Sequence, residues 1–517
     1  MMKGNIMNCT IARIISLALA VLMCSAALTA CASAPDDDTT VTTTTPAAGD
    51  IAPADTTPSG DATSETTSAP EDIRITPNLP DANFNGHKFT VLTRGQSSAS
   101  WYSRDIYSET ITGDVISDAV YSRNKLIEDQ YNFEVVEVGS DDPANVAKNS
   151  IMAENDEFDM VCIRIKDHIT SLINSGLLHD LNTLELMDLS QPYYDQHAMK
   201  FLSIANKQFM VTGDLLTMDN DATRCALFNK VLFNNLDLEQ NPAVGDTLYN
   251  IVKQGKWTLD VLETCSTLAT TDLDGDNQMT DADQWGMANE VFNSLALYNA
   301  AGNVLFEKDP VTDIPSYTAY NEKSIDAFLR IIPLVRADHS KWYSNAYNEV
   351  HPFFQEGKIL FHLAQLCEVS LYRAMEFDFG IIPLPKYDEN QERYYSPITA
   401  YGSNCISVPI TASNLDRTAT IIEALSCESM YTVTPAYYEI TLEGKMLRDP
   451  ESVEMLDIIL STTMFELGYI WTWGNIYSSV CQFTTNEDTN IASKFKAMER
   501  VCNKGIQSTL EAVEKAG

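Results

Sequence analysis

The chain has 517 residues, of which 72 are acidic and 34 are Lys or Arg, and its formal net charge at pH 7 is -38. Lys and Arg supply the contacts that hold nucleic-acid phosphates and anionic lipid, so this balance argues against both kinds of partner. A chain of this length exceeds what one hydrophobic core usually serves, so we expect more than one lobe.

The N-terminus reads as an export signal. Two basic residues precede the apolar run Ile14–Leu28, which is shorter than the roughly 20 apolar residues of a membrane span. The run ends in the tetrapeptide LTAC, which resembles the lipobox of bacterial lipoproteins and closes on Cys31. We therefore predict a lipoprotein signal peptide over 1–30 and a lipidated Cys31, with the protein anchored on the extracellular face of the cell membrane. The alternative is an ordinary secretory signal followed by an unrelated cysteine.

A polar segment follows the lipidation site. Residues 31–80 are rich in Thr, Ala, Pro, Ser and Asp and have scarcely any large apolar side chains. Such a segment cannot bury enough surface to offset the entropy lost on ordering, so it is predicted to be a disordered tether. As a flexible coil it would reach roughly 40 Å from the membrane.

The first elements of the globular part alternate between strand and helix. Lys88–Leu92, Phe133–Val138 and Phe158–Ile163 have the apolar and β-branched content of strands, and Asp114–Gln130 has apolar residues at helical spacing. Connections of this length predict an α/β fold with a mostly parallel sheet.

Eight cysteines follow Cys31 in the chain, and none forms a CxxC pair. Most are flanked by apolar residues, so we predict buried thiols. One or two disulfides are the alternative in an exported protein, and the sequence does not define their pairing.

The acidic loop from residue 272 to residue 283 has the spacing of a calcium-binding loop, because side-chain oxygens at alternate positions can converge on a hard cation. Asn277 occupies the position where such loops have glycine, and asparagine tolerates the left-handed backbone conformation required there. The predicted ligands are Asp272, Asp274, Asp276, the carbonyl of Gln278, and Asp283 as the closing carboxylate. A structural Ca²⁺ is the expected cofactor, and a solvated acidic turn is the alternative.

Four segments occur in a characteristic order: GKWTLD at 255–260, DQWG at 283–286, FQEGKIL at 354–360 and DFGIIPLPKYD at 378–388. Together with the lipobox, this succession resembles the extracellular solute-binding proteins of family 1, the sugar-binding lipoproteins of ABC transporters, in their Gram-positive anaerobe form. The resemblance covers most of residues 85–517. It implies a periplasmic-binding-protein-like type II α/β fold, with two lobes and a ligand cleft between them.

By the same resemblance, residues 81–217 plus about 400–440 form lobe one, and residues 218–399 plus about 441–517 form lobe two. The chain would cross between the lobes near 219–224 and again near 401–406.

A carbohydrate site needs aromatic rings for the C–H faces of sugars and polar side chains for their hydroxyls. Candidates follow the first strand, the predicted crossing, the FQEGKILFHLA strand, and an extended segment with two indoles. The predicted ligand-binding residues are Arg94, Trp101, Tyr102, Asp105, Asp219, Asn220, Gln365, Trp471 and Trp473. For each aromatic residue, ordinary core packing is the alternative.

The resemblance implies a monomeric binding protein that captures a carbohydrate, an oligosaccharide in particular, and delivers it to ABC permease subunits in the membrane. The sequence contains no GxSxG, HExxH, P-loop or GxGxxG motif, and we predict no catalytic residue. A ligand-sensing or peptide-binding lipoprotein, an adhesive lipoprotein and a carbohydrate-active enzyme remain the alternatives.

Overall fold

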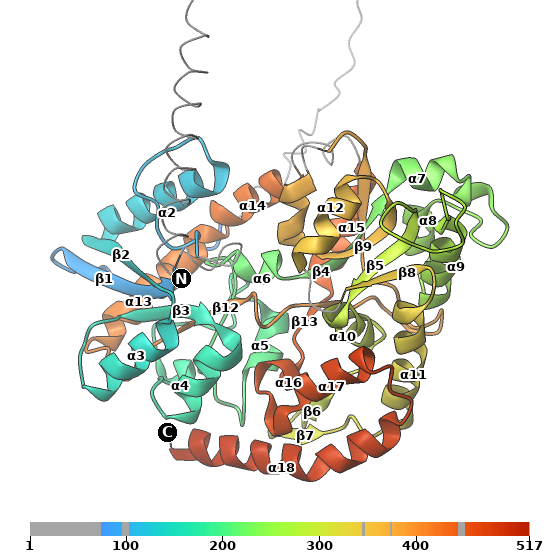
Figure 1. Cartoon of the computed structure of the whole chain (residues 1–517). Helices are drawn as coiled ribbons and strands as arrows, with labels where there is room; N and C mark the ends of the chain where they lie inside the picture. Colours follow the sequence, from blue (N-terminus) through green and yellow to red (C-terminus); the bar gives the residue numbers. More distant parts are fainter. Residues whose placement is uncertain (1–73, 96–102, 344–346, 373–374, 443–449, 516–517) are drawn as a thin grey trace, which may run out of the picture. The chain divides into compact units, whose positions relative to one another are not determined.

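The computed structural model describes residues 74–95, 103–343, 347–372, 375–442 and 450–515 (Figure 1). Two main sheets organise these residues, and we call the residues packed around them the first and second lobes. Among the helices in the described ranges, none combines the length and the apolar character that a membrane span requires.

The first sheet has the strand order β12-β3-β1-β2. Strand β1 pairs in parallel with β2 and β3, and β12 joins the edge in antiparallel orientation. The three strands predicted for the start of the globular part are therefore confirmed. The strands are β1 (His87–Arg94), β2 (Phe133–Ser140), β3 (Met160–Arg164) and β12 (Asn404–Ser407).

The helix predicted over 114–130 is α2 (Val115–Tyr131). The side chain of Asp114 caps it by accepting a hydrogen bond from the backbone N–H of Ser117, and the helix ends at Asn132 in the left-handed conformation. Helix α2 contacts α13 and α14, so helices from late in the chain complete the first lobe. The other helices here are α3 (Pro143–Met152), α4 (Thr170–Asn174), α5 (Gln196–Leu202), α13 (Leu415–Ser429) and α14 (Val433–Leu442).

The second sheet has the order β10-β4-β9-β5-β8. Strand β5 pairs in parallel with β8 and β9, but β4 is antiparallel to both of its neighbours. The expectation of a mostly parallel sheet is wrong for this lobe. Strand β4 enters directly from the first lobe, so no local strand–helix–strand unit sets its direction. The strands are β4 (Arg224–Asn229), β5 (Trp285–Glu290), β8 (Ser340–Tyr343), β9 (Ile359–Gln365) and β10 (Phe379–Ile382).

Helices and two small strand pairs surround the second sheet. Helix α10 is buried along nearly its whole length, and α18 packs against α4, α11 and β7. The helices are α7 (Lys230–Asn235), α8 (Leu248–Lys253), α9 (Leu259–Ala269), α10 (Val291–Ala300), α11 (Glu322–Arg336), α12 (Tyr347–Gln355), α15 (Pro450–Ser461), α16 (Leu467–Ile470), α17 (Ile476–Thr485) and α18 (Ile491–Lys515). The small pairs are β6 (Phe306–Lys308) with β7 (Pro315–Tyr317), and β11 (Ser396–Pro397) with β13 (Thr463–Met464).

Two chain segments cross between the sheets side by side. Helix α6 (Met218–Asp221) leads into β4, and an isolated bridge pairs Thr223 with Ile398 in antiparallel orientation. The backbone N–H of Thr399 donates to the carbonyl of Ala222 at 3.0 Å. These contacts place two crossing segments next to each other between the sheets.

Residues 74–80, the part of the predicted tether that the structure describes, contact the first lobe. Arg74 forms an ion pair with Glu428 and stacks on the ring of Tyr431, and Ile75 and Leu79 pack against the core of the first lobe. Because most of the segment is polar, its composition did not indicate that Ile75 and Leu79 would pack against the core. The part of the predicted tether that lies within the described residues is therefore docked on the body.

Six cysteines are buried thiols, as predicted from their apolar neighbours. Burial raises the pKa of Cys265 to about 12 and that of Cys427 to about 11, so both stay protonated and act as small apolar side chains. The six are Cys162, Cys225, Cys265, Cys405, Cys427 and Cys502.

Candidate functional site

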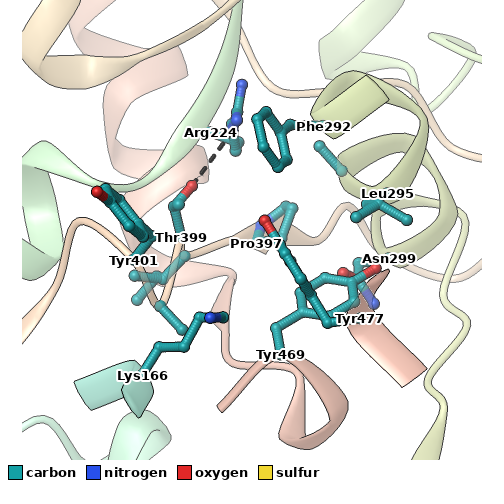
Figure 2. A pocket seen from close by; sticks show the side chains of 13 residues that line it. Lys166, Arg224, Phe292, Leu295, Asn299, Pro397, Thr399, Tyr401, Tyr469 and Tyr477 are labelled. Atoms are coloured by element: carbon teal, nitrogen blue, oxygen red, sulfur yellow. Dashed lines mark hydrogen bonds between the residues drawn. The ribbon is translucent and has the colours of Figure 1, made fainter. Parts of the chain in front are cut away.

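A pocket lies where elements of both lobes meet at the crossing segments. It has about 420 Å³ of empty space, part of which is open solvent. Figure 2 shows its lining, with Arg224 and Phe292 at the top of the view and Lys166 and Tyr469 at the bottom. The lining residues are Lys166, Arg224, Phe292, Leu295, Ala296, Asn299, Pro397, Ile398, Thr399, Ala400, Tyr401, Tyr469 and Tyr477.

Aromatic rings from three helices form one wall of the pocket. Phe292 of α10 stacks on Tyr477 of α17 with ring centroids 6.2 Å apart, and Tyr469 of α16 meets Tyr477 edge to face at 5.4 Å. Rings held in this way by their neighbours present fixed apolar faces to a ligand.

Arg224, the first residue of β4, is held from two sides. Its Nε donates to Thr399 Oγ1 at 3.3 Å, and its Nη1 donates to Asn293 Oδ1 at 3.1 Å. Asn293 in turn donates to Asn289, which donates to Ser340. This chain of neutral hydrogen bonds fixes a guanidinium group at the pocket.

Lys166 follows β3 and belongs to the first lobe. Its Nζ pairs with the exposed Asp167 and lies 5.2 Å from the centre of the Tyr477 ring, which belongs to the second lobe. Arg164, two residues earlier, lies over the ring of Tyr401 at 4.6 Å and donates to the carbonyl of Lys166 at 2.8 Å. The first lobe therefore contributes cationic side chains to this region.

Two lining residues have buried polar atoms without a hydrogen-bond partner among the described residues. These atoms are Oδ1 of Asn299 and the hydroxyl of Tyr469. Burial raises the pKa of Tyr469 well above its ordinary value, so its hydroxyl keeps its proton. A buried polar group that lacks a partner costs about 1–3 kcal/mol, so both groups favour the arrival of a polar ligand or water.

None of the seven predicted ligand-binding residues that the structure describes lines this pocket. Arg94, at the end of β1, is buried behind it and donates to the backbone carbonyls of Gly402 and Tyr401 at 3.1 and 3.3 Å. Burial and the nearby charge of Arg164 lower the pKa of Arg94 to about 10. Arg94 thus supports the segment that carries Tyr401.

The predicted acidic residues act inside the protein. Asp105 is fully buried and accepts from Ser103 Oγ at 3.2 Å and from the backbone N–H of Thr217 at 2.8 Å. Asp219 accepts from Thr212 Oγ1 at 2.7 Å and from the backbone N–H of Asn220 at 2.8 Å. Burial raises the pKa of Asp219 to about 7. Both carboxylates hold the segment that enters the crossing, because their oxygens accept from its backbone or from neighbouring hydroxyls.

Gln365 and the two indoles also belong to the interior. Gln365 pairs with Arg224 across β9 and β4, and its Oε1 is buried without a partner among the described residues. Trp471 and Trp473 stack with centroids 5.6 Å apart and planes within 3°, and both are buried. The Nε1 of Trp473 donates to Thr509 of α18 at 3.0 Å, so this indole packs into the core as the alternative interpretation expected.

Three further predictions lie outside the described residues: Trp101, Tyr102 and the lipidation site Cys31.

The acidic loop has part of the predicted geometry. Carboxylate oxygens of Asp272, Asp274 and Asp276 lie within 4.8 Å of one another, and Asn277 has the left-handed backbone expected for it, with φ of 63°. Asp283 differs from the prediction, because it lies outside this group and its oxygens accept from the backbone N–H groups of Thr280 and Leu273. These two hydrogen bonds lower the pKa of Asp283.

In the same loop, the backbone N–H of Gln278 donates to Asp276 Oδ1 at 2.7 Å. Of the four predicted carboxylate ligands, the loop brings together Asp272, Asp274 and Asp276.

A buried His–His–Glu cluster was not predicted from the sequence. Oε2 of Glu368 lies 2.7 Å from Nε2 of His362 and 3.0 Å from Nε2 of His351, a spacing that could also hold a metal ion. Burial alone would raise the pKa of Glu368, but His362 and His351 together lower it. No local motif signals this cluster, because α12, β9 and the turn after β9 each supply one member. His362 is buried in β9, and among the described residues its Nδ1 has no hydrogen-bond partner.

The described residues that line the pocket were not among the predicted ligand-binding residues. Arg224 closes the segment 219–224 that was predicted to cross, and Tyr469 lies two residues before the predicted Trp471. Both residues therefore lie in or next to segments that the sequence indicated as parts of the crossing or of the binding site. Lys166, Phe292 and Tyr477 carry no such signal, because ordinary helix and loop segments contain such residues everywhere.

No protein-family model matches the sequence, and no curated protein sequence matches it. Solved structures do match. The galacto-N-biose-/lacto-N-biose I-binding protein of an ABC transporter from Bifidobacterium longum, in complex with lacto-N-biose, has a TM-score of 0.53 at 10% identity, covering 83% of this chain and 98% of its own. UspC from M. tuberculosis has a TM-score of 0.53 at 14% identity, covering 81% and 100%.

An ABC substrate-binding protein from Listeria monocytogenes, in complex with cycloalternan, has a TM-score of 0.50 at 14% identity, covering 82% and 99%. The likeness spans nearly all of each of these proteins and most of this chain. It confirms the predicted periplasmic-binding-protein-like fold, with α/β lobes on either side of crossing segments.

Proposed function

We propose that this protein is an extracytoplasmic solute-binding protein that captures a carbohydrate and delivers it to the permease of an ABC importer. The observation that carries this proposal is the pocket between the two sheets, with its aromatic wall of Phe292, Tyr469 and Tyr477. Its position at the crossing segments lets both lobes contact one ligand. Two of the structures with the same fold were solved with saccharides bound, which supports the same class of ligand here.

The chemistry of the lining suits a sugar. The C–H faces of a pyranose stack on aromatic rings, and its hydroxyls pair with groups such as Asn299 and the Tyr469 hydroxyl. Binding, rather than hydrolysis, is the role we assign to these residues.

The purified protein should gain thermal stability with one class of saccharide and should not hydrolyse it. At about 100 times the dissociation constant, ligand binding adds roughly 2.7 kcal/mol to the free energy of unfolding. The measurement is a thermal-shift screen over glycans and peptides, followed by calorimetry. Tyr477→Ala should abolish the shift, whereas Tyr320→Ala, at an exposed ring outside the pocket, should keep it.

A shift with peptides alone would identify a peptide-binding protein and refute the carbohydrate assignment. Release of reducing sugar from any glycan would identify an enzyme.

We further propose that Cys31 carries a lipid and that the Thr-rich segment after it holds a monomeric binding protein near its permease at the extracellular face of the membrane. The apolar run and the LTAC tetrapeptide support this placement. A tether keeps the loaded protein at a high effective concentration beside its membrane partner.

We also propose that the acidic loop binds a structural Ca²⁺. Asp272, Asp274 and Asp276 would supply carboxylate oxygens, the donors that Ca²⁺ prefers. Three negative charges within 4.8 Å repel one another, and a divalent cation would relieve that repulsion. The ion would hold the loop between α9 and β5 and would take no part in ligand capture.

Titration of the metal-free protein with Ca²⁺ in a calorimeter should show one binding event that Asp274→Ala abolishes. Asp309→Ala is the matched control, because the Asp309 carboxylate also accepts from backbone N–H groups of an exposed turn, those of Val311 and Thr312, but lies outside the cluster. Heat from Ca²⁺ that is identical in wild type and Asp274→Ala would refute the site.

A further inference from the structure

We infer that the saccharide bound in this pocket carries an anionic substituent, a carboxylate or a sulfate ester, which Arg224 and Lys166 bind together. This inference rests on the proposed function and narrows its class of ligand.

The charge of the pocket is opposite to that of the chain. Acidic residues outnumber Lys and Arg by 72 to 34 over the whole sequence, but the described residues that line the pocket include Lys166 and Arg224 and no carboxylate. A solvated surface of this protein would be expected to show the reverse.

Arg224 is available to an anion. It is only 6% exposed, and the hydrogen bonds found for its guanidinium engage Nε and Nη1 with the neutral acceptors Thr399 and Asn293. Among the described residues, no carboxylate lies within ion-pair distance of it. Glu290 is the acidic group that interacts with it electrostatically at longer range, and burial raises the pKa of Glu290 while Arg224 lowers it. A buried guanidinium without a directly paired carboxylate is stabilised by an anionic ligand that it can hold with two parallel hydrogen bonds.

Three more cations of the first lobe reinforce this region. Lys166 lines the pocket beside Tyr477, Arg164 covers the face of Tyr401, and Arg94 is buried behind the Tyr401 backbone. Asp167 is the acidic side chain that partners Lys166, and it is half exposed and 3.9 Å from Arg164. The acidic groups near the pocket are Asp167, Glu290 and Glu466, which accepts from Asn299 at 3.2 Å and whose pKa burial raises to about 7. The four cations exceed these groups, and the excess points to a negatively charged ligand.

The two lining cations come from different lobes. Lys166 follows β3 of the first sheet, and Arg224 begins β4 of the second. Figure 2 shows Arg224 at the top and Lys166 at the bottom of the view. An anionic substituent held by both would pull the lobes together on one ligand, while the ring that carries it packs on Phe292 and Tyr477. A neutral sugar would gain only the aromatic contacts and the hydroxyl hydrogen bonds.

The test compares the affinity of the purified full chain for matched acidic and neutral saccharides. The probes are galacturonic acid oligosaccharides with their methyl esters, glucuronic acid disaccharides with their methyl esters, and sulfated disaccharides with their desulfated counterparts. We expect at least one acidic probe to bind about 10-fold to 100-fold more tightly than its neutral partner. We also expect this preference to shrink as NaCl is raised. The uronate and sulfate series identify which anion the pocket takes.

The variants Arg224→Gln and Lys166→Gln should each lower the affinity for the acidic probe more than the affinity for its neutral partner, and so remove most of the preference. Arg224→Lys keeps the positive charge and should retain part of the preference. A preference that is kept by Arg224→Lys and lost by Arg224→Gln therefore depends on the charge and not on misfolding. Arg330→Gln is the control. Arg330 pairs with Asp260 and Glu263 on the surface, so its substitution should not change the preference for the acidic probe.

Equal or tighter binding of neutral saccharides would overturn this inference and leave the carbohydrate-binding function intact. Failure of every saccharide, acidic or neutral, would overturn the proposed function itself.

Discussion

Replacement of Glu368 with alanine should lower the free energy of unfolding by about 3–5 kcal/mol, the range for breaking a buried charged cluster. The Glu368 side chain is 2% exposed, and its Oε2 lies 2.7 and 3.0 Å from the Nε2 atoms of His362 and His351. Its Oε1 accepts from the backbone N–H of Gln365 at 3.0 Å. Alanine would leave these donors buried without their acceptor. Urea unfolding followed by fluorescence measures the loss.

Two further variants define this effect. Glu368→Gln keeps the shape and one acceptor, so we expect a smaller loss of about 1–2 kcal/mol. Glu376→Ala, at an exposed glutamate nearby in sequence, should change the stability by less than about 0.5 kcal/mol. If Glu368→Ala were as stable as Glu376→Ala, the cluster would make no net contribution to the fold.

Replacement of Trp473 with alanine should cost about 3–5 kcal/mol of stability, as for other buried aromatic side chains. The indole stacks on Trp471, meets Phe306 edge to face at 5.0 Å, and donates to Thr509. Helix α18 reaches it through Gly505, where a Cβ atom would lie only 3.0 Å from the ring. The loss is measured by denaturant unfolding, with Tyr107→Ala at an exposed ring as the control.

A second variant of Trp473 distinguishes a role in the core from the ligand-binding role predicted from the sequence. Trp473→Phe loses the hydrogen bond to Thr509 and should be less stable by about 1 kcal/mol, with an unchanged affinity for saccharide. A variant with normal stability and a much weaker affinity would instead restore Trp473 to the binding site.

Helix α2 and strand β1 were predictable because the residues within each segment are sufficient to indicate it. Apolar residues at helical spacing and a capping aspartate define α2, and the β-branched run of β1 defines a strand, so both lie within two residues of the predicted bounds. The direction of β4 was not predictable in this way. It depends on the entry of the chain from the other lobe, and no property of Arg224–Asn229 encodes that.

Polar residues near strand ends were good candidates for ligand contacts but proved to have partners inside the protein. Asp105 and Asp219 each accept hydrogen bonds that hold the segment entering the crossing, and Arg94 supports the segment that carries Tyr401. A buried polar side chain serves structure and function through the same chemistry, so its sequence context does not separate the two roles.

The sequence by itself determined the α/β class, the order of the early strands and helices, the buried state of six of the eight described thiols and the left-handed turn at Asn277. Each of these depends on the intrinsic preference of a residue or on a repeat over a few positions. Only the tertiary structure decided the pocket, the Glu368 cluster and the docking of Arg74 and Ile75. Lys166, Arg224, Phe292 and Tyr477 lie far apart along the chain, and they meet because two crossing segments bring separate sheets to one place.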